Sequence, residues 1–233
     1  MSYINPRLDR EAIREALARN GRVLIRDFFE PQVVESLAGA LDAVDWRLLF
    51  RDDSGDRKLL ADELRGLTPA ARMELTSGIN RLAEREFQFL FYSHSMVDTA
   101  KQGETDVLTR CVRWMADEEF LSVMRGISGM DDISRVYAQA TLYSRGNFLL
   151  LHSDETSIER RRLAYVINLT RRWRPDWGGL LQFADDEGNV VDTFFPHFNS
   201  LALFTVPQQH FVSYVAPYAQ GTRHAITGWL IAA

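Results

Sequence analysis

The sequence is poor in cysteine and in long apolar runs. Its 233 residues include one cysteine, Cys111, so no disulfide can form within the chain, and the composition fits a reducing compartment. No apolar run approaches the roughly 20 residues that a membrane-spanning helix needs, and the first residues lack the apolar stretch of a signal peptide. We therefore expect a soluble, cytoplasmic protein that does not enter a membrane.

Positive charge is also in short supply. The 27 lysines and arginines are outnumbered by 32 acidic residues, which gives a net charge of −5. Nucleic acids and anionic membranes select basic surfaces, so neither is an expected partner. The hydrophobic share of 46% is enough for a sizeable core, and the length fits one domain over residues 1–233. The composition leaves the oligomeric state open.

The first part of the chain, residues 1–130, has the periodicity of helices. Apolar residues recur at helical spacing in residues 9–19, after Pro31, after Thr68-Pro69 and in residues 117–125. Residues 23–29 are apolar and β-branched, which predicts a strand, whereas residues 51–57 are polar and predict a loop. The aromatic segment 87–92 fits either a helix or a strand. We expect this part to be a helix-rich support.

The second part, residues 131–233, consists of short apolar or alternating runs separated by turn residues. These runs lie at 136–143, 148–152, 163–169, 180–183, 190–195, 200–206, 211–215 and 225–231. The segments 144–147 and 185–189 predict hairpin turns. Such spacing is typical of a sandwich or barrel. We expect an α+β protein with a mainly β core, namely a double-stranded β-helix (jelly-roll) barrel with the N-terminal helices packed on its outer face.

Two of the five histidines stand in a pattern that predicts a metal site. The first is in the triplet His152-Ser153-Asp154, and residues two apart on a strand face the same side. His210 begins a later strand and adds a second imidazole. Two histidines and one carboxylate leave three coordination positions open, which is the arrangement of non-haem iron(II) oxygenases. We interpret the remaining histidines as satisfied or exposed side chains: His94, His197 and His224.

Arg223 adds a candidate anion site. It opens an otherwise apolar strand, and a guanidinium that lines a barrel is costly unless it meets an anion. Its planar fork suits a carboxylate held through two hydrogen bonds. Neighbouring residues on a strand face opposite ways, so His224 points outward if Arg223 points inward.

These motifs, together with residues 143–148 and Trp177-Gly178-Gly179, resemble those of the prolyl-hydroxylase branch of iron(II)/2-oxoglutarate oxygenases. The likeness is strongest to the catalytic domain of the protein prolyl 3,4-dihydroxylases that act on a ribosomal protein. It covers residues 23–231 and is firm from residue 136 onward. The resemblance implies that iron is held by His152, Asp154 and His210.

The resemblance also implies a cosubstrate site. Arg223 would pair with the distal carboxylate of 2-oxoglutarate, and Tyr143 stands where the family usually has a tyrosine hydrogen-bonded to the cosubstrate. Asn168 stands where related proteins often carry a second such tyrosine, and its amide can still donate to a carboxylate. Two-domain members of the family carry a second barrel, and its function is expected to be absent from a chain that ends at Ala233.

The implied reaction is hydroxylation of an unactivated C–H, first of all in a prolyl residue of a protein or peptide. It uses Fe(II), O2 and 2-oxoglutarate, releases succinate and CO2, and has ascorbate as a possible reductant. Free proline or another small metabolite is the alternative substrate. A zinc hydrolase stays open because His2Asp can bind zinc, although Arg223 and Tyr143 would then have no role. A non-catalytic binding barrel also stays open, but it would be expected to have lost a ligand.

Further residues are candidates for the surroundings of this site. An apolar shell around the metal is expected from Leu150, Leu180 and Phe204. The basic groups 160–162 and 171–174 either border the entrance and favour an acidic partner or are ordinary solvated charges. Trp173 and Trp177 can stack on a proline ring or pack at the barrel rim.

Overall fold

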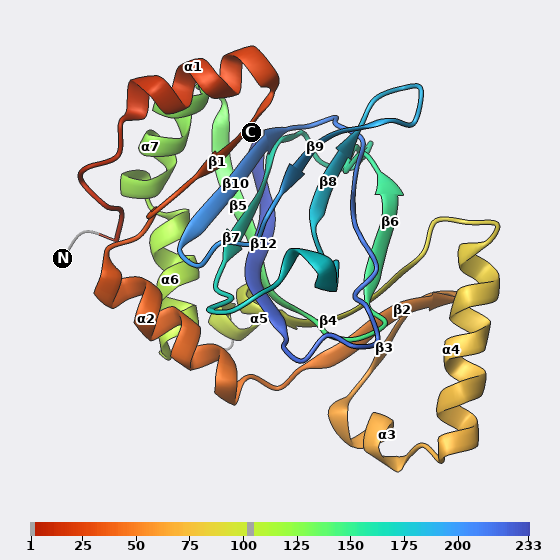
Figure 1. Ribbon diagram of the computed structural model, residues 1–233. Coiled ribbons are helices and arrows are strands. Elements are labelled where there is room, and N and C mark those ends of the chain that lie inside the picture. Colours follow the sequence, from red (N-terminus) through yellow and green to blue (C-terminus); the bar gives the residue numbers. More distant parts are fainter. Residues whose placement is uncertain (1–2, 102–104) are drawn as a thin grey trace.

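An antiparallel sheet that rolls into a nearly closed barrel dominates the structure (Figure 1). The computed structural model describes residues 3–101 and 105–233, and within them the sheet has 12 strands. Ten strands pair in the following order: β1 (Arg22–Ile25), β10 (Ser200–Thr205), β7 (Arg161–Asn168), β12 (Arg223–Ala232), β5 (Ile133–Tyr143), β4 (Phe89–Ser95), β6 (Phe148–His152), β11 (His210–Val212), β8 (Leu181–Ala184) and β9 (Val190–Phe194). The order mixes early and late strands, as expected for a jelly roll.

The two ends of this order approach each other through side chains. The guanidinium of Arg22 on β1 lies 2.9 Å from the carboxylate of Asp192 on β9. Arg22 also donates to the side-chain oxygen of Gln208. These contacts join the edges of the barrel where no ladder between β1 and β9 is present among the described residues. The predicted mainly β barrel is therefore confirmed.

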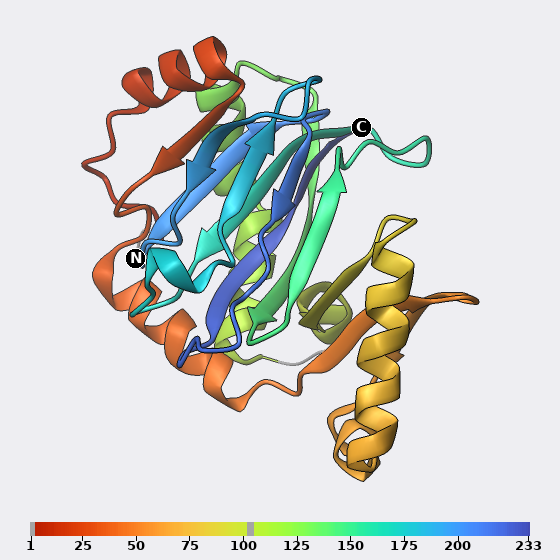
Figure 2. The ribbon, with the colours of Figure 1, turned by 45° about the vertical axis from the view of Figure 1, so that its right-hand side comes forward.

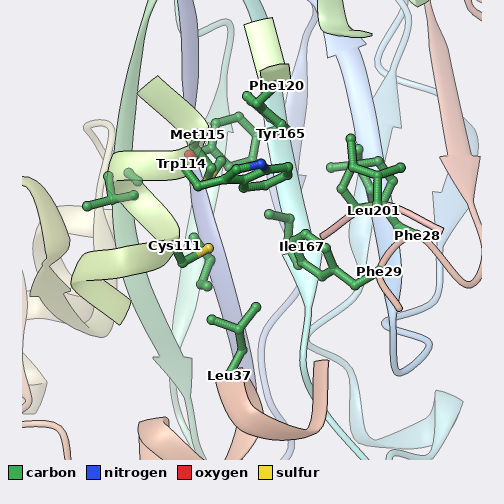
Figure 3. Packing of buried hydrophobic residues seen from close by; sticks show 14 of the residues in the cluster. Phe28, Phe29, Leu37, Cys111, Trp114, Met115, Phe120, Tyr165, Ile167 and Leu201 are labelled. Atoms are coloured by element: carbon green, nitrogen blue, oxygen red, sulfur yellow. The ribbon is translucent and has the colours of Figure 1, made fainter. Parts of the chain in front are cut away.

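Helices cover one outer face of the barrel (Figure 1). They are α1 (Arg10–Asn20), α2 (Pro31–Ala40), α5 (Met96–Lys101), α6 (Val107–Ala116) and α7 (Glu118–Ser128), with a short 3-10 turn at Leu41–Ala43. Their apolar sides and the outer side of the sheet form the main core. Figure 3 shows part of it: Phe28, Phe29, Leu37, Cys111, Trp114, Met115, Phe120, Tyr165, Ile167 and Leu201. The expected packing of N-terminal helices on the barrel is confirmed.

A hairpin and two helices project from the side of the barrel (Figure 2). They are β2 (Arg47–Asp52), β3 (Gly55–Leu59), α3 (Ala61–Gly66) and α4 (Pro69–Ala83). Thr68 caps α4 by accepting a hydrogen bond from the N–H of Ala71. A second apolar cluster ties this unit to the barrel: Leu48, Phe50, Ile79, Leu90 and Phe148. Because β2 pairs with β4, the unit continues the sheet.

The structure contradicts three predictions from the sequence: the loop at 51–57, the extent of the strand at 23–29 and the hairpin turn at 144–147. Residues 51–57 are not a loop, because they form the tip and flanks of the β2–β3 hairpin. The strand predicted at 23–29 ends at Ile25, and Asp27 has a positive φ of 53° that breaks the extended backbone. Segment 144–147 is a turn but not a hairpin, because β4 pairs with both β5 and β6 and separates them. The second predicted hairpin turn, at 185–189, joins the paired strands β8 and β9.

No helix within residues 3–101 and 105–233 combines the length and the apolar character of a bilayer-spanning segment. The ambiguous segment 87–92 largely belongs to β4.

Gly228 in β12 provides a test of the packing of the barrel. A Cβ added there would lie 1.8 Å from the carbonyl oxygen of Tyr137 and 2.9 Å from the hydroxyl oxygen of Tyr165. We expect Gly228→Ala to lower the free energy of unfolding by about 3 kcal/mol, as for an overpacked core. The measurement is urea unfolding.

Gly126 in α7 is the matched control for this substitution. It has no heavy atom within 4 Å of an added Cβ, so Gly126→Ala is expected to raise the free energy of unfolding by about 0.5–1 kcal/mol. Equal effects of the two substitutions would contradict the packing described for β12.

Candidate metal centre

Three side chains converge at one end of the barrel interior. One potential ligand atom from each of His152, Asp154 and His210 lies within 4.8 Å of the other two. The Nε2 atom of His152 is 3.4 Å from Oδ1 of Asp154, and Nε2 of His210 is 3.4 Å from Oδ2 of the same carboxylate. His152 and His210 stand directly opposite each other in the pairing of β6 with β11. The structure thus brings together the three residues that the sequence singled out.

The backbone that positions them differs from the expected strand alternation. His210 pairs with His152, and Val212 pairs with Leu149. Between these two pairs β6 therefore has one residue more than β11. This bulge lets both Leu149 and His152 face the cavity. Asp154 lies beyond the end of β6 and has a positive φ of 60°. A left-handed residue, rather than a continuing strand, therefore turns the carboxylate toward the imidazoles.

Hydrogen bonds from the far side of each ring orient the two histidines. The Nδ1 atom of His152 is 2.9 Å from the carbonyl oxygen of Leu150, and Nδ1 of His210 is 2.8 Å from that of Gln208. A carbonyl can only accept, so each Nδ1 carries the proton and each Nε2 presents its lone pair to the centre. Two such lone pairs and a carboxylate repel one another unless a cation lies between them. The donor set therefore fits a divalent metal ion with open coordination positions.

The charge state of Asp154 agrees with this geometry. Burial alone would raise the pKa of its carboxyl group, but without a bound cation, rings of His152 and His210 that also carry a proton on Nε2 can donate to it, and this outweighs burial and holds the pKa well below its usual value. The group is therefore a carboxylate throughout the neutral range and is ready to bind a cation.

A cavity of about 700 Å³ extends from the triad into the barrel, and Arg223 is buried in its wall. The residue is 3% exposed, and its Nη1 donates to the carbonyl oxygen of Gly179 at 2.9 Å. Among the described residues no carboxylate pairs with Arg223 and its Nε has no partner. Burial lowers its pKa to about 10, although the facing Tyr143 acts in the opposite direction. A buried guanidinium that meets only neutral groups is suited to bind an anion.

Tyr143 lines the cavity opposite Arg223, whereas Asn168 does not. Tyr143 is the pairing partner of Arg223 in the β5–β12 ladder, and burial raises the pKa of its hydroxyl above the usual value. The Asn168 amide nitrogen donates to the Ser200 hydroxyl at 3.1 Å, and its oxygen accepts from Nη2 of Arg223 at 3.4 Å. Asn168 therefore lies behind the guanidinium and supports it.

The apolar shell expected around the metal is correct for one residue of three. Phe204 lines the cavity, and its ring meets that of His210 at 4.7 Å. Leu150 packs instead in the cluster beneath α4, because the bulge in β6 turns it away from the cavity. Leu181 lines the wall in place of Leu180. Because side chains alternate along β8, a difference of one residue moves the inward-facing position from Leu180 to Leu181.

The arginine and tryptophan candidates mostly lie outside the cavity. Of the two basic groups, 160–162 and 171–174, only Arg161 lines the cavity. Four of the other arginines form ion pairs at the surface: Arg160 and Arg162 with Asp132, Arg171 with Glu35, and Arg174 with Asp176. Trp173 and Trp177 pack on each other with ring centroids 5.2 Å apart, and the indole N–H of Trp173 donates to Gly178. They are rim packing residues.

The other histidines do not line the cavity within the described part of the chain: His94, His197 and His224. His224 stacks on Trp46 at 5.8 Å, on the side of β12 opposite to Arg223, as expected.

The sequence analysis missed Trp229 at the cavity mouth and named Arg161 only as part of a basic group. The guanidinium of Arg161 lies 3.6 Å above the ring of Trp229, and it donates to the backbone carbonyl of Asp154 at 3.2 Å. Trp229 is six residues after Arg223 on the same strand, so alternation could have placed both on one face. Arg161 carries no comparable signal, because it stands within a run of three arginines.

Comparisons with known proteins agree with this site. Residues 138–231, which include the triad and Arg223, match the family model of the 2OG-Fe(II) oxygenase superfamily. This segment of the chain is therefore similar to that superfamily. A 124-residue stretch is 28% identical to prolyl 3-hydroxylase OGFOD1 of Mus musculus and covers 51% of this chain. This chain spans only 22% of the length of that relative.

Solved structures share the fold of this chain. A prolyl-4-hydroxylase of Pseudomonas putida superposes with a TM-score of 0.62 at 17% identity, over 96% of this chain and 99% of that one. A Trichoplax adhaerens prolyl hydroxylase, in complex with a peptide fragment of the hypoxia inducible factor oxygen degradation domain, gives a TM-score of 0.61 at 17% identity, over 96% and 89%. At these identities the likeness concerns the fold alone.

Proposed function

We propose that the protein is an Fe(II)- and 2-oxoglutarate-dependent dioxygenase that hydroxylates a prolyl residue of a protein or peptide and releases succinate and CO2. The observation that carries the proposal is the His152–Asp154–His210 triad in one cavity with a buried guanidinium, Arg223, that has no anionic partner among the described residues. A metal site and an anion site in one apolar chamber suit a dicarboxylate cosubstrate that has to reach the metal.

Each residue then has a defined role. Bound iron(II) supplies the oxidation of 2-oxoglutarate by O2 that makes an unactivated C–H reactive. His152, Asp154 and His210 hold the ion, and Arg223 fixes the distal carboxylate through its guanidinium fork. The hydroxyl of Tyr143 donates to the same carboxylate.

Neighbouring groups keep this arrangement in place. Asn168 orients Arg223 from behind, and therefore acts as a positioning residue and not as a direct ligand of the cosubstrate. Phe204 and Leu181 exclude water from the wall.

The choice of a prolyl substrate rests on the relatives and on the cavity mouth. The matching curated relatives in Mus musculus and Xenopus laevis are prolyl 3-hydroxylases by name, and two solved structures of this fold are prolyl hydroxylases. The Trp229 ring lines the cavity between the guanidinium of Arg161 and the stacked ring of Tyr137, so its edge offers an apolar contact for a pyrrolidine ring. Free proline or another small metabolite is the second candidate. A zinc hydrolase would leave Arg223 without a function.

Three further properties are part of the proposed function. The protein works in the cytoplasm, ascorbate serves as reductant of the iron, and residues 1–233 act as one catalytic domain. The barrel and its helices share one core, which supports the last point.

The test is a screen for succinate production from 2-oxoglutarate with a panel of proline-containing peptides and of free metabolites. Mass spectrometry then locates one added oxygen atom on any hit. We expect hydroxylated peptide. A protein that binds Fe(II) and 2-oxoglutarate but oxidises free metabolites alone would refute the choice of a peptide substrate.

Trp229 allows a prediction about the substrate alone. We expect Trp229→Ala to raise KM for the hydroxylated peptide about tenfold, which corresponds to about 1.4 kcal/mol of lost contact. The slow 2-oxoglutarate turnover in the absence of peptide should stay within about twofold. Trp46→Ala is the control, because that ring stacks on His224 outside the cavity. An unchanged KM for the Trp229 variant would remove this residue from the substrate site.

A further inference from the structure

Strand β3 leaves one edge of the sheet open beside the active-site cavity. In the described part of the chain β3 pairs with β2 and with no other strand. Its three central residues, Asp56, Arg57 and Lys58, are exposed. Leu49 of β2 and Asp56 of β3 both line the cavity that holds the metal ligands. An open edge with unpaired backbone groups is a ready template for another strand.

The hydrogen bonds of β2 reveal which backbone groups of β3 face outward. Both the N–H and the C=O of Arg51 bond to the side chain of Gln88, on the β4 side of the strand, at 2.9 and 3.0 Å. Arg51 and Asp56 are therefore a pair without mutual hydrogen bonds in the β2–β3 ladder. The N–H and C=O of Asp56 point away from β2, and two residues further those of Lys58 do the same.

The side chains of this edge add charge on the cavity side. Alternation places Lys58 on the same face as Asp56, and Asp56 already pairs with Arg51 at 3.0 Å. Within residues 3–101 and 105–233 no carboxylate pairs with Lys58. Arg57, on the other face, pairs with Asp52. The edge thus offers two outward backbone positions and a cation next to the cavity.

We propose that the open edge of β3 binds an extended segment of the polypeptide substrate as an added strand, with an acidic side chain of that segment meeting Lys58. The inference rests on the proposed function, because it requires a polypeptide whose prolyl residue enters the cavity. Main-chain hydrogen bonds supply affinity with little dependence on sequence, and alternate side chains supply selectivity. The edge lies beside the cavity, so one extended segment can occupy both.

The test compares Lys58→Pro with Lys58→Ala. Proline removes the outward N–H of residue 58 and leaves the β2–β3 ladder intact, since the N–H groups of Arg57 and Leu59 face β2. The probes are two peptides with the same central proline, one of about 20 residues that can lie along β3 as well as in the cavity, and one of about 5 residues that is too short to pair with both outward positions of β3. We expect Lys58→Pro to raise KM for the long peptide about fivefold beyond Lys58→Ala, and to leave KM for the short peptide unchanged.

The possible outcomes separate this inference from the proposed function. Equal KM values for Lys58→Pro and Lys58→Ala with the long peptide would overturn the role of the edge while peptide hydroxylation still stands. A wild-type dimer in size-exclusion chromatography that Lys58→Pro dissociates would also overturn it, since a second copy would then occupy the edge. Hydroxylation of free proline and of no peptide would refute the proposed function itself. Peptide-free 2-oxoglutarate turnover verifies that each variant is folded.

Discussion

Replacing His210 with alanine is expected to reduce 2-oxoglutarate turnover at least about 100-fold, since even the loss of residues that support metal ligands costs 10–100-fold. His210 supplies one of three donor atoms, and its Nε2 faces the Asp154 carboxylate at 3.4 Å. The ring is buried against Phe204, so the variant also leaves a cavity. Succinate formation measures turnover, and elemental analysis of the anaerobically loaded protein measures bound iron.

A second variant separates loss of the metal from loss of packing. Asp154→Asn keeps the shape of the side chain and removes the charge that balances the cation, so it should lose iron and turnover without the same loss of stability. His197→Ala is the control, because His197 contacts Phe195 and does not line the cavity within the described residues. Normal turnover in both the His210 and Asp154 variants would show that these residues do not hold a catalytic metal ion.

The second large effect concerns Arg223, whose replacement by alanine should raise KM for 2-oxoglutarate about 100-fold or more. Two charge-assisted hydrogen bonds to a carboxylate contribute about 1.5–3 kcal/mol each. Arg223→Lys keeps the charge but loses the fork, so its KM should fall between those of the wild type and the alanine variant. Initial rates at varied 2-oxoglutarate concentration measure the difference. Arg160→Ala is the control, because Arg160 pairs with Asp132 at the surface.

Thermal unfolding tests the same site without turnover. Under nitrogen with Fe(II), 2-oxoglutarate at 100 times its Kd should stabilise the wild type by about 2.7 kcal/mol. The alanine variant should gain almost nothing at that concentration. Without 2-oxoglutarate it should be no less stable than the wild type, because a buried guanidinium facing neutral groups is removed. Equal stabilisation of both proteins by 2-oxoglutarate would place the cosubstrate elsewhere.

The strand pattern and the site residues were predictable because they depend on local sequence. Apolar runs ended by turn residues marked the barrel strands, and the helix from Pro31 begins at the predicted residue. His152, Asp154, His210 and Arg223 were selected by chemistry and spacing, and the structure brings them to one cavity.

The remaining features depend on contacts between distant segments. The bulge in β6 arises from its pairing with β11, about 60 residues away, and it decides that Leu149 rather than Leu150 faces the cavity. The left-handed conformation of Asp154 could not be predicted from the sequence, because aspartate adopts this conformation only occasionally and nothing nearby marks the position. The sequence predicts a loop at residues 51–57, in place of the tip and flanks of the β2–β3 hairpin, because an exposed edge strand is polar.

An anaerobic titration shows whether iron(II) and 2-oxoglutarate bind together at the triad. Fe(II) is added to the protein under nitrogen, then 2-oxoglutarate, and the visible absorption spectrum is recorded after each step. We expect a charge-transfer band that appears with 2-oxoglutarate, saturates at one equivalent of iron and is absent from Asp154→Asn. A spectrum that stays featureless in the visible range, from a protein that binds zinc at the same residues, would contradict this expectation.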